Sequence, residues 1–217
     1  MHADAPDIFA GWDEFAASYS DLALDLYMAD HGRYRRRRYA VYLLSAGSVL
    51  RSVHQPHYQS TKYNWLNGNV ERWFEPIAGH VAGGATLQAI LQLCYAVFAP
   101  LRPDVKTWHT EVHQFRIEAS VGAAGQPTPE GVHRDGVDFV LVLLVKRENI
   151  RAGTTTLHAP CGEQISAFTL TEPGDSVWLD DQRLFHGVTP VQEANTDFPA
   201  FRDVLVVTLK PLVESAN

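Results

Sequence analysis

Two histidines, one aspartate and one arginine have the types and spacing of a metal site with an anion-binding neighbour. His133 and Asp135 stand two residues apart, His186 follows in Phe-His-Gly, and Arg202 lies in Phe-Arg-Asp-Val. Two imidazoles and one carboxylate form the facial ligand set that leaves open positions on a non-haem Fe(II). A guanidinium offers a planar pair of donors to a carboxylate. These residues predict an iron site with an acid-bearing cosubstrate beside it.

The first two of these residues belong to a predicted strand. Side chains at positions i and i+2 of a strand point to the same face, so His133 and Asp135 can reach one ion. The apolar run 138–145 that follows is typical of a buried strand and puts the pair at its start. A His-x-Asp pair alone is a weak signal in a chain with 10 histidines.

The other two residues follow or open further predicted strands. His186 comes after a short strand over 176–181 that ends in a turn, and Arg202 opens a last strand over 204–209. The specificity of the pattern lies in the order of its parts: His-x-Asp before a strand, a later strand and turn ending in His, and Arg at the entry to a final strand.

Several segments also carry a family resemblance. They are 59–68, 108–117, 129–139, 168–173, 179–190 and 201–205. In this order, over roughly residues 33–210, the chain resembles the small bacterial Fe(II)/2-oxoglutarate dioxygenases that hydroxylate free amino acids, the group typified by L-isoleucine 4-hydroxylase. The resemblance implies that His133, Asp135 and His186 bind the iron and that Arg202 anchors 2-oxoglutarate. Val204 stands where many members of the wider superfamily have a hydroxyl residue, so a second contact to the distal carboxylate is unassigned.

The resemblance also implies a substrate class. It is a free aliphatic or cyclic amino acid, hydroxylated at an unactivated C–H bond with consumption of O2 and release of succinate and CO2. A zwitterion needs a cation or amide for its carboxylate and an acceptor for its ammonium group. The side chains expected to supply these contacts are Gln59, Asn64, Gln114, Arg116, Glu130 and Arg134. The sequence leaves open which amino acid and carbon react, whether a carrier holds the substrate, and whether the product is hydroxylated, desaturated or cyclised.

Composition restricts the class of protein. The chain has 217 residues, 46% hydrophobic and 20% charged, which is ordinary for one globular domain with a core of useful size. A net charge of −7 argues against nucleic acid as a partner, because phosphate binding needs a basic face. No apolar run approaches the length of a membrane span, and the acidic first residues do not resemble a signal peptide.

Cysteine usage suits a reducing compartment. Cys94 sits in an apolar helical pattern and Cys161 in a turn, and two cysteines do not make a disulfide framework. Free thiols and an Fe(II) site both favour a cytoplasmic protein. The oligomeric state is open.

The chain changes character near its middle. Residues 1–107 hold the helical patterns and residues 108–212 are almost all strand and turn. The periodicity predicts helices over 14–28 and 86–98 and strands over 39–44 and 49–54. We therefore expect a single dioxygenase domain over 1–217, mainly β with N-terminal helices (α+β). Its expected architecture is a double-stranded β-helix, a cupin-like jelly roll with helices packed on one sheet.

Other patterns favour structural roles. The run of four arginines 35–38 is typical of a solvated face or of ion pairs, and alternation along a strand would send two of them to each side. His109 and His113 have helical spacing but lie in a stretch that alternates like a strand, which argues against a metal site there.

Two further functions stay open. A cupin-like metal enzyme that does not use 2-oxoglutarate would leave Arg202 without a role. A non-catalytic jelly-roll binding module would leave the His/Asp/His set without one, since binding needs no open positions on iron.

Overall fold

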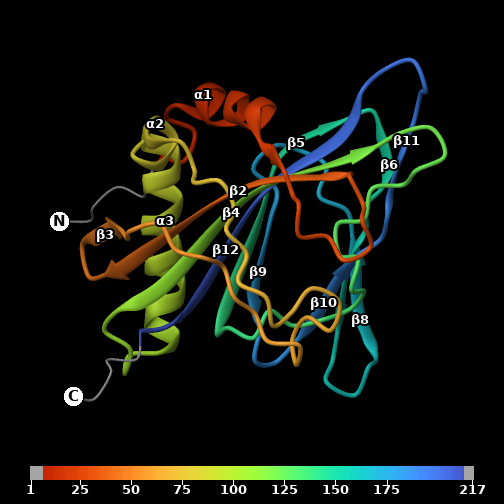
Figure 1. Ribbon diagram of the computed structural model, residues 1–217. Helices are drawn as coiled ribbons and strands as arrows, with labels where there is room; N and C mark the ends of the chain where they lie inside the picture. Colours follow the sequence, from red (N-terminus) through yellow and green to blue (C-terminus); the bar gives the residue numbers. More distant parts are fainter. Residues whose placement is uncertain (1–6, 213–217) are drawn as a thin grey trace.

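Long alternating segments form one antiparallel sheet in the computed structural model, which describes residues 7–212 (Figure 1). The sheet has seven strands, of which six follow the order β1-β2-β4-β12-β5-β9 while β3 pairs with β2. Their bounds are β1 Ala23–Leu24, β2 Arg35–Ser45, β3 Ser48–Arg51, β4 Trp108–Ala119, β5 Phe139–Glu148, β9 Ser176–Asp180 and β12 Ala200–Pro211. The strands predicted over 39–44, 138–145, 176–181 and 204–209 fall in this sheet, and β3 covers the first part of the one predicted over 49–54.

Two smaller sheets complete the β-structure. β10 (Phe185–Val188), β7 (Thr155–His158) and β8 (Gln164–Phe168) form one, and β11 (Val191–Glu193) pairs with β6 (Ile150–Ala152). Leu157 and Phe168 of the three-stranded sheet pack against Val140 and Val177 of the large one. The two sheets therefore face each other as in a jelly roll, and the predicted mainly-β class with N-terminal helices is confirmed.

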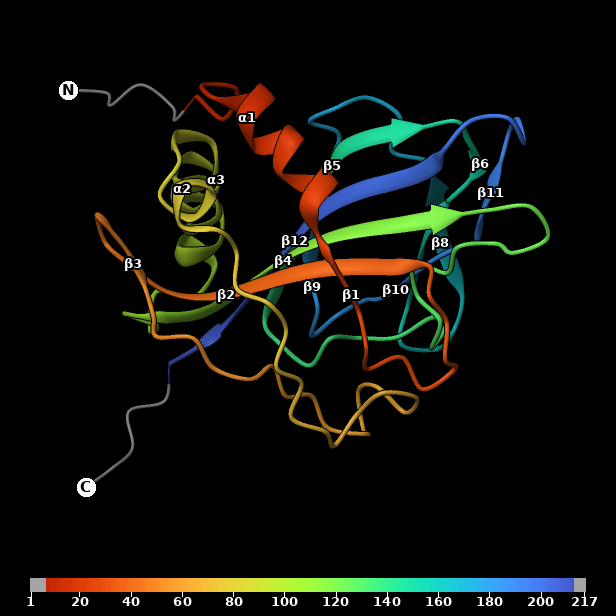
Figure 2. The same ribbon diagram turned by 45° about the horizontal axis from the view of Figure 1, so that its top comes forward.

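The helices cover one face of the large sheet. They are α1 (Trp12–Ala17), the 3-10 turn η1 (Ser18–Asp21), α2 (Gly79–Ala82), α3 (Ala85–Phe98) and the 3-10 turn η2 (Ala99–Leu101). α3 confirms the helix predicted over 86–98, and its buried face joins a large apolar cluster with Phe15 of α1 and with alternate residues of the strands. In Figure 2, α1 lies above the large sheet, and the segment between β3 and α2 runs below the sheet.

The helix predicted over 14–28 is wrong after its first turns. It ends at Ala17, passes through η1 and becomes β1. The buried Asp25 explains the change, because its carboxylate accepts a hydrogen bond from Arg35 at 2.8 Å and from the Tyr27 N–H at 2.9 Å. A long-range ion pair thus overrides the local helical pattern, and Leu26 of that pattern is 79% exposed.

The strand β2 shows how the two faces of the sheet differ. Ala40, Tyr42 and Leu44 belong to the apolar cluster beneath the helices. Arg35 and Arg37, on the opposite face of the same strand, line a cavity.

Among the described residues, no helix is long and apolar enough to cross a membrane.

Candidate active site

The predicted metal-binding residues meet across two chain segments. His133 and Asp135 lie between β4 and β5, and His186 lies on β10. His133 and His186 exchange two backbone hydrogen bonds of 2.9 Å, which hold the histidines opposite each other. One potential ligand atom of each of the three residues lies within 4.8 Å of the others. The pair precedes β5 by several residues, so this short bridge, and not the start of a strand as predicted, aligns it.

The hydrogen bonds of His133 leave its outer nitrogen available to a metal. Its Nδ1–H donates to the Gly131 carbonyl at 3.0 Å, and its Nε2 lies 3.6 Å from the Asp135 carboxylate. Such a second contact fixes the tautomer of a metal-binding histidine. Burial lowers the pKa of His133, but Asp135 and Glu130 outweigh it and the pKa is raised to about 9. The carboxylates thus favour positive charge at Nε2, as a bound cation would provide.

His186 is held as a neutral imidazole. Burial lowers its pKa to about 4 despite the attraction of Asp135, so near neutral pH the ring is uncharged and has one unprotonated nitrogen to offer to a metal. Its Nε2 lies 3.6 Å from the other oxygen of Asp135. Two imidazole nitrogens and one carboxylate therefore fit the donor set that Fe(II) takes.

Asp181 supports this cluster, and the sequence interpretation missed it. Its carboxylate accepts hydrogen bonds from the backbone N–H of Asp135 at 3.0 Å, Gly136 at 2.8 Å and Val137 at 3.2 Å. Burial and the charge of Asp135 raise the pKa of Asp181 to about 6. The one signal for this role in the sequence was an acidic residue in the turn that leads to His186.

Gly136 permits close packing behind Asp135. Its φ is +81°, and a Cβ there would lie 2.5 Å from the Tyr63 ring. A side chain at this position would displace either the metal-binding segment or Tyr63.

A cavity of about 270 Å³ contains the cluster. Of the residues predicted to contact substrate, Gln59, Asn64 and Glu130 line it. Gln59 donates from Nε2 to the backbone carbonyl of Asp135 at 3.0 Å, and the Asn64 side chain accepts the N–H of Asn67 at 2.7 Å. Both of these side chains therefore also shape the wall of the cavity.

Gln114, Arg116 and Arg134 do not line the cavity, so the structure does not bring these three side chains to the place where their substrate contacts were predicted. Gln114 donates to the Ser18 hydroxyl on the helix side of the sheet. Arg116 holds Asp203 through two hydrogen bonds of 2.8 and 2.7 Å. Arg134 stacks over Phe185 outside the cavity.

Arg202 on β12 is a buried cation without a counterion in the described part of the chain. It lines the cavity and is 2% exposed, and its Nε and Nη2 have no hydrogen-bond partner. Burial, with repulsion from Arg147, lowers its pKa to about 10, so it stays charged at neutral pH. A buried guanidinium is stable when a hydrogen-bonded anion faces it. The distal carboxylate of 2-oxoglutarate has the charge and shape for this position.

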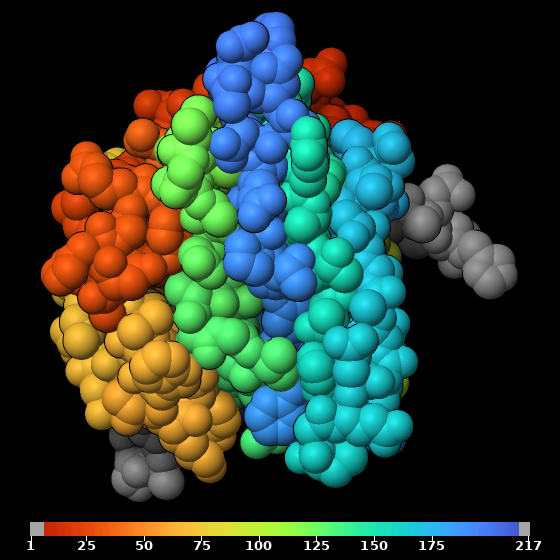
Figure 3. Space-filling model, turned by 90° about the vertical axis from the view of Figure 1, so that its right-hand side faces the viewer, coloured from red at the N-terminus to blue at the C-terminus, as the bar shows by residue number. Residues whose placement is uncertain are grey.

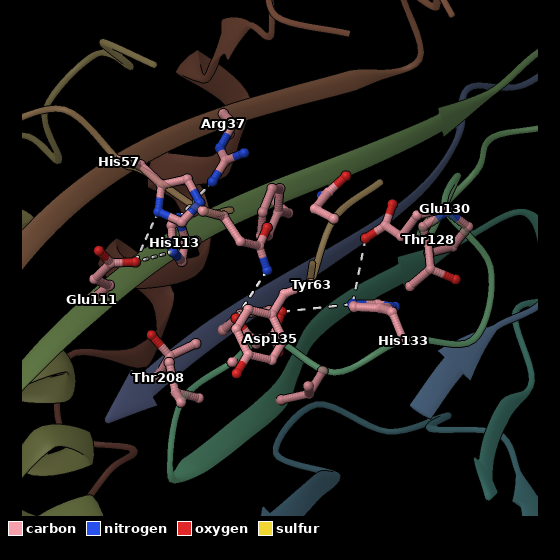
Figure 4. A pocket seen from close by; sticks show the side chains of 18 of the residues that line it. Arg37, His57, Tyr63, Glu111, His113, Thr128, Glu130, His133, Asp135 and Thr208 are labelled. Carbon is pink, nitrogen blue, oxygen red and sulfur yellow. Dashed lines mark hydrogen bonds and ion pairs between the residues drawn. The ribbon is translucent and has the colours of Figure 1, made fainter. Parts of the chain in front are cut away.

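A second polar group lies in the same cavity (Figure 4). Glu111 accepts hydrogen bonds from Tyr39 at 3.0 Å and from His57 at 2.8 Å, and His113 Nε2 lies 3.6 Å away. Arg37 donates to His113 Nδ1 at 2.6 Å, and burial lowers the pKa of His113 to about 3. The one proton of the neutral ring is therefore on Nε2, facing Glu111, which argues against a second metal site. His113 lies on β4 with His109, as the alternation of that stretch predicts.

The arginine run 35–38 divides as strand alternation predicts. Arg36 pairs with Glu118 and Arg38 with Asp21 outside the cavity, whereas Arg35 and Arg37 surround the buried Asp25. Arg72 joins them in the cavity wall. Two guanidinium groups paired with one aspartate, and a third beside them in the wall, give this wall an excess of positive charge.

Comparison with known proteins places this site in a family. The sequence model of the 2OG-Fe dioxygenase family matches residues 16–208, which is most of the chain. The chain belongs to the 2OG-Fe dioxygenase family. It is an enzyme that depends on Fe(II), 2-oxoglutarate and O2, and the predicted family resemblance is confirmed at this level.

Three relatives of this dioxygenase are informative. L-isoleucine-4-hydroxylase of Bacillus thuringiensis is 26% identical over 93% of this chain and 87% of its own. 3(1)-hydroxy-L-isoleucine 4-dioxygenase of Pantoea ananatis is 23% identical over 91% of this chain and 80% of its own. The crystal structure of a bsmA homolog from Methylobium petroleophilum PM1 superposes with a TM-score of 0.86 at 38% identity, covering 93% of this chain and 81% of that one.

Proposed function

We propose that this dioxygenase hydroxylates an unactivated C–H bond of a free aliphatic or cyclic amino acid. The observation that carries the proposal is the charge in the cavity beyond what iron and 2-oxoglutarate use. The cations Arg35 and Arg37, paired with Asp25, and Arg72 in the same cavity wall are separate from Arg202 and favour a second acid-bearing ligand. The relatives named L-isoleucine-4-hydroxylase and 3(1)-hydroxy-L-isoleucine 4-dioxygenase support an amino acid as that ligand.

We assign His133, Asp135 and His186 as the iron ligands and Arg202 as the 2-oxoglutarate anchor. The iron and 2-oxoglutarate, when bound, supply the oxidising chemistry, with succinate and CO2 as by-products. The protein residues position the reactants and exclude water. Asp181 and Gln59 hold the backbone of Asp135 from two sides, through its N–H and its carbonyl. Positioning the reactants and excluding water require no general base from the protein.

A metal enzyme that does not use 2-oxoglutarate and a non-catalytic binding module are not favoured. The first would leave the buried charge of Arg202 uncompensated, and the second would not need the His/Asp/His cluster.

We further propose that residues 1–217 form one catalytic domain that works in the cytoplasm. The described Cys94 and Cys161 are free thiols, which suits a reducing compartment that maintains Fe(II).

A screen of free amino acids tests the proposal. Each is incubated with the enzyme, Fe(II), ascorbate and 2-oxoglutarate, and the products are analysed by mass spectrometry for one added oxygen and for succinate. We expect at least one amino acid to couple 2-oxoglutarate turnover to hydroxylation. Coupling only by a carrier-bound or peptidyl amino acid would contradict the proposal.

A further inference from the structure

Arg72 and Glu130 present opposite charges to the same cavity, and each has polar atoms without a partner in the described part of the chain. Arg72 forms an isolated β-bridge with His57 and is 2% exposed, and its Nε and Nη2 have no partner in the described part of the chain. The Glu130 side chain is 9% exposed and its Oε2 has no partner there either. Both residues line the cavity. Leaving a buried charge without a partner is costly, so both groups are expected to meet a ligand.

The two side chains do not neutralise each other. No ion pair joins them among the described residues, although each lies close enough to influence the other. Burial lowers the pKa of Arg72, and the carboxylates of Asp25 and Glu130 act against this change. A ligand with one negative and one positive end could occupy the space between them.

Apart from Arg202, which we assign to 2-oxoglutarate, the neighbouring cations Arg35 and Arg37 are engaged within the protein. Arg35 uses its Nε and Nη2 on one oxygen of Asp25, both at 2.8 Å. Arg37 donates to His113, and its guanidinium lies between the rings of Phe74 at 3.6 Å and Phe115 at 4.3 Å. Arg72 is the member of this group with two donors left over.

Other acids of the cavity are engaged as well. Glu111 receives hydrogen bonds from Tyr39 and His57 and faces His109 and His113. Asp135 belongs to the metal cluster. Glu130 retains a free oxygen, and its other oxygen lies 3.4 Å from His133 Nε2 (Figure 4).

We propose that Arg72 binds the α-carboxylate of the substrate and Glu130 its α-ammonium group, so that the pair selects free α-amino acids. This inference rests on the proposed function and deepens it. The contact of Glu130 with His133 places the ammonium end beside the metal cluster. An N-acylated amino acid would lack the positive charge that Glu130 binds. A carrier thioester would lack the negative charge that Arg72 binds.

The segment that supplies Arg72 is tied to the segment that supplies Glu130. The Trp65 indole N–H donates to the backbone carbonyl of Glu130 at 3.0 Å. In Figure 3 the stretch around residues 55–70, coloured orange to yellow at the lower left, lies beside the green chain that includes the segment of Glu130. The bond fixes one chain segment to the other and thereby helps to set the distance between the two charges.

Ligands that lack one charge test the assignment. Anaerobic calorimetry on the enzyme with Fe(II) and 2-oxoglutarate compares L-isoleucine, L-isoleucinamide and 2-hydroxy-3-methylpentanoate. If the screen finds another amino acid, that acid, its amide and its α-hydroxy acid replace them. We expect the wild-type protein to bind each analogue about 10- to 100-fold more weakly than the amino acid, as a charged hydrogen bond is lost.

Two variants show which residue reads which charge. Arg72→Gln should weaken amino-acid binding by about 10- to 100-fold and leave binding of the amide unchanged. Glu130→Gln should do the same to the amino acid and leave binding of the hydroxy acid unchanged. Arg36→Gln and Glu118→Gln are matched controls, because their ion pair lies outside the cavity, and both should bind like the wild type.

Several results would overturn the inference without affecting the proposed function. These are equal loss of amino acid and amide by Arg72→Gln, equal loss of amino acid and hydroxy acid by Glu130→Gln, and unchanged amino-acid affinity in either variant. Equal affinity of the wild type for all three ligands would also overturn it, even if a variant failed to fold. A wild-type enzyme that couples no free amino acid would instead reject the proposed function and the inference with it.

Discussion

The two faces of the large sheet come from the same strands but carry opposite chemistry. On β2, Tyr42 and Leu44 enter the apolar cluster under the helices, while Arg35 and Arg37 enter the cavity. On the helix face, burial of apolar side chains stabilises the fold without any ligand. On the cavity face, buried charges are balanced by one another or await a ligand. Alternation along a strand thus lets one segment serve stability and binding independently.

Of the changes on the cavity face, removal of an iron ligand should have the largest effect on activity. We expect His186→Ala to lose bound iron and to reduce hydroxylation to background, because two remaining protein ligands hold a labile divalent ion poorly. Iron content after desalting and product formation are the measurements. His158→Ala, on the neighbouring strand β7, is the control. Full activity in His186→Ala would refute the assignment of the metal site.

Replacement of Arg202 by lysine separates the effect of its charge from the effect of its planar geometry. Lysine keeps the charge but loses the planar pair of donors. Loss of a buried ion-pair contact costs about 2–5 kcal/mol, so the KM for 2-oxoglutarate should rise about 30-fold or more. Steady-state kinetics measure it, with the exposed Arg151→Lys as control. An unchanged KM would mean that another basic residue holds the cosubstrate.

A large-to-small change on the helix face should affect stability alone. Leu91 of α3 is fully buried, and Leu91→Ala should lower the free energy of unfolding by about 2–5 kcal/mol. Urea unfolding measures the loss, and the exposed Leu101→Ala is the control. The KM for 2-oxoglutarate should stay at the wild-type value below the transition. A parallel rise in KM would show that the two faces are coupled.

Asp181 tests whether the backbone around Asp135 needs an anionic acceptor. Asp181→Asn keeps one carbonyl oxygen and turns an amide group toward backbone N–H donors, so iron affinity should fall about 10- to 100-fold. Competition with a chelator measures the affinity. Asp180→Asn is the control, because its side chain accepts the Gln182 N–H outside the cluster. Equal iron affinities in the two variants would show that Asp181 does not support iron binding.

The smallest effect concerns pH. Burial lowers the pKa of His113 to about 3 from the ordinary value of 6.5, so between these values the unfolded chain binds more protons than the folded one. The stability of the fold that is linked to the neutral His113 ring is present in full above pH 6.5 and is lost as the pH falls toward 3. His113→Gln should therefore lose less unfolding free energy between pH 7 and pH 4.5 than the wild type, each pKa unit being worth about 1.4 kcal/mol. Identical losses in urea unfolding would contradict this.

Much of the site was predictable because it rests on short-range patterns. The His-x-Asp pair, the later histidine and the arginine entering the last strand are each tied to a strand or turn. The helix at 86–98 was predictable for the same reason, since a dense apolar repeat ends at prolines.

The parts that could not be predicted depend on contacts between distant segments. Gln114 and Arg116 do share a face, but a change of one residue decides which face that is, and the cavity side belongs to His113 and Phe115. Asp181 reaches the backbone of Asp135, and Arg72 reaches the cavity, through turns and bridges that local patterns do not reveal.

Binding of 2-oxoglutarate to the anaerobic Fe(II) protein tests the central claim most directly. If the cluster and Arg202 form one site, adding 2-oxoglutarate should produce a weak visible charge-transfer band in the wild type. The band should be absent in His186→Ala and should need far more 2-oxoglutarate in Arg202→Lys. An undiminished band in His186→Ala, at the wild-type concentration of 2-oxoglutarate, would place the iron elsewhere and contradict the account.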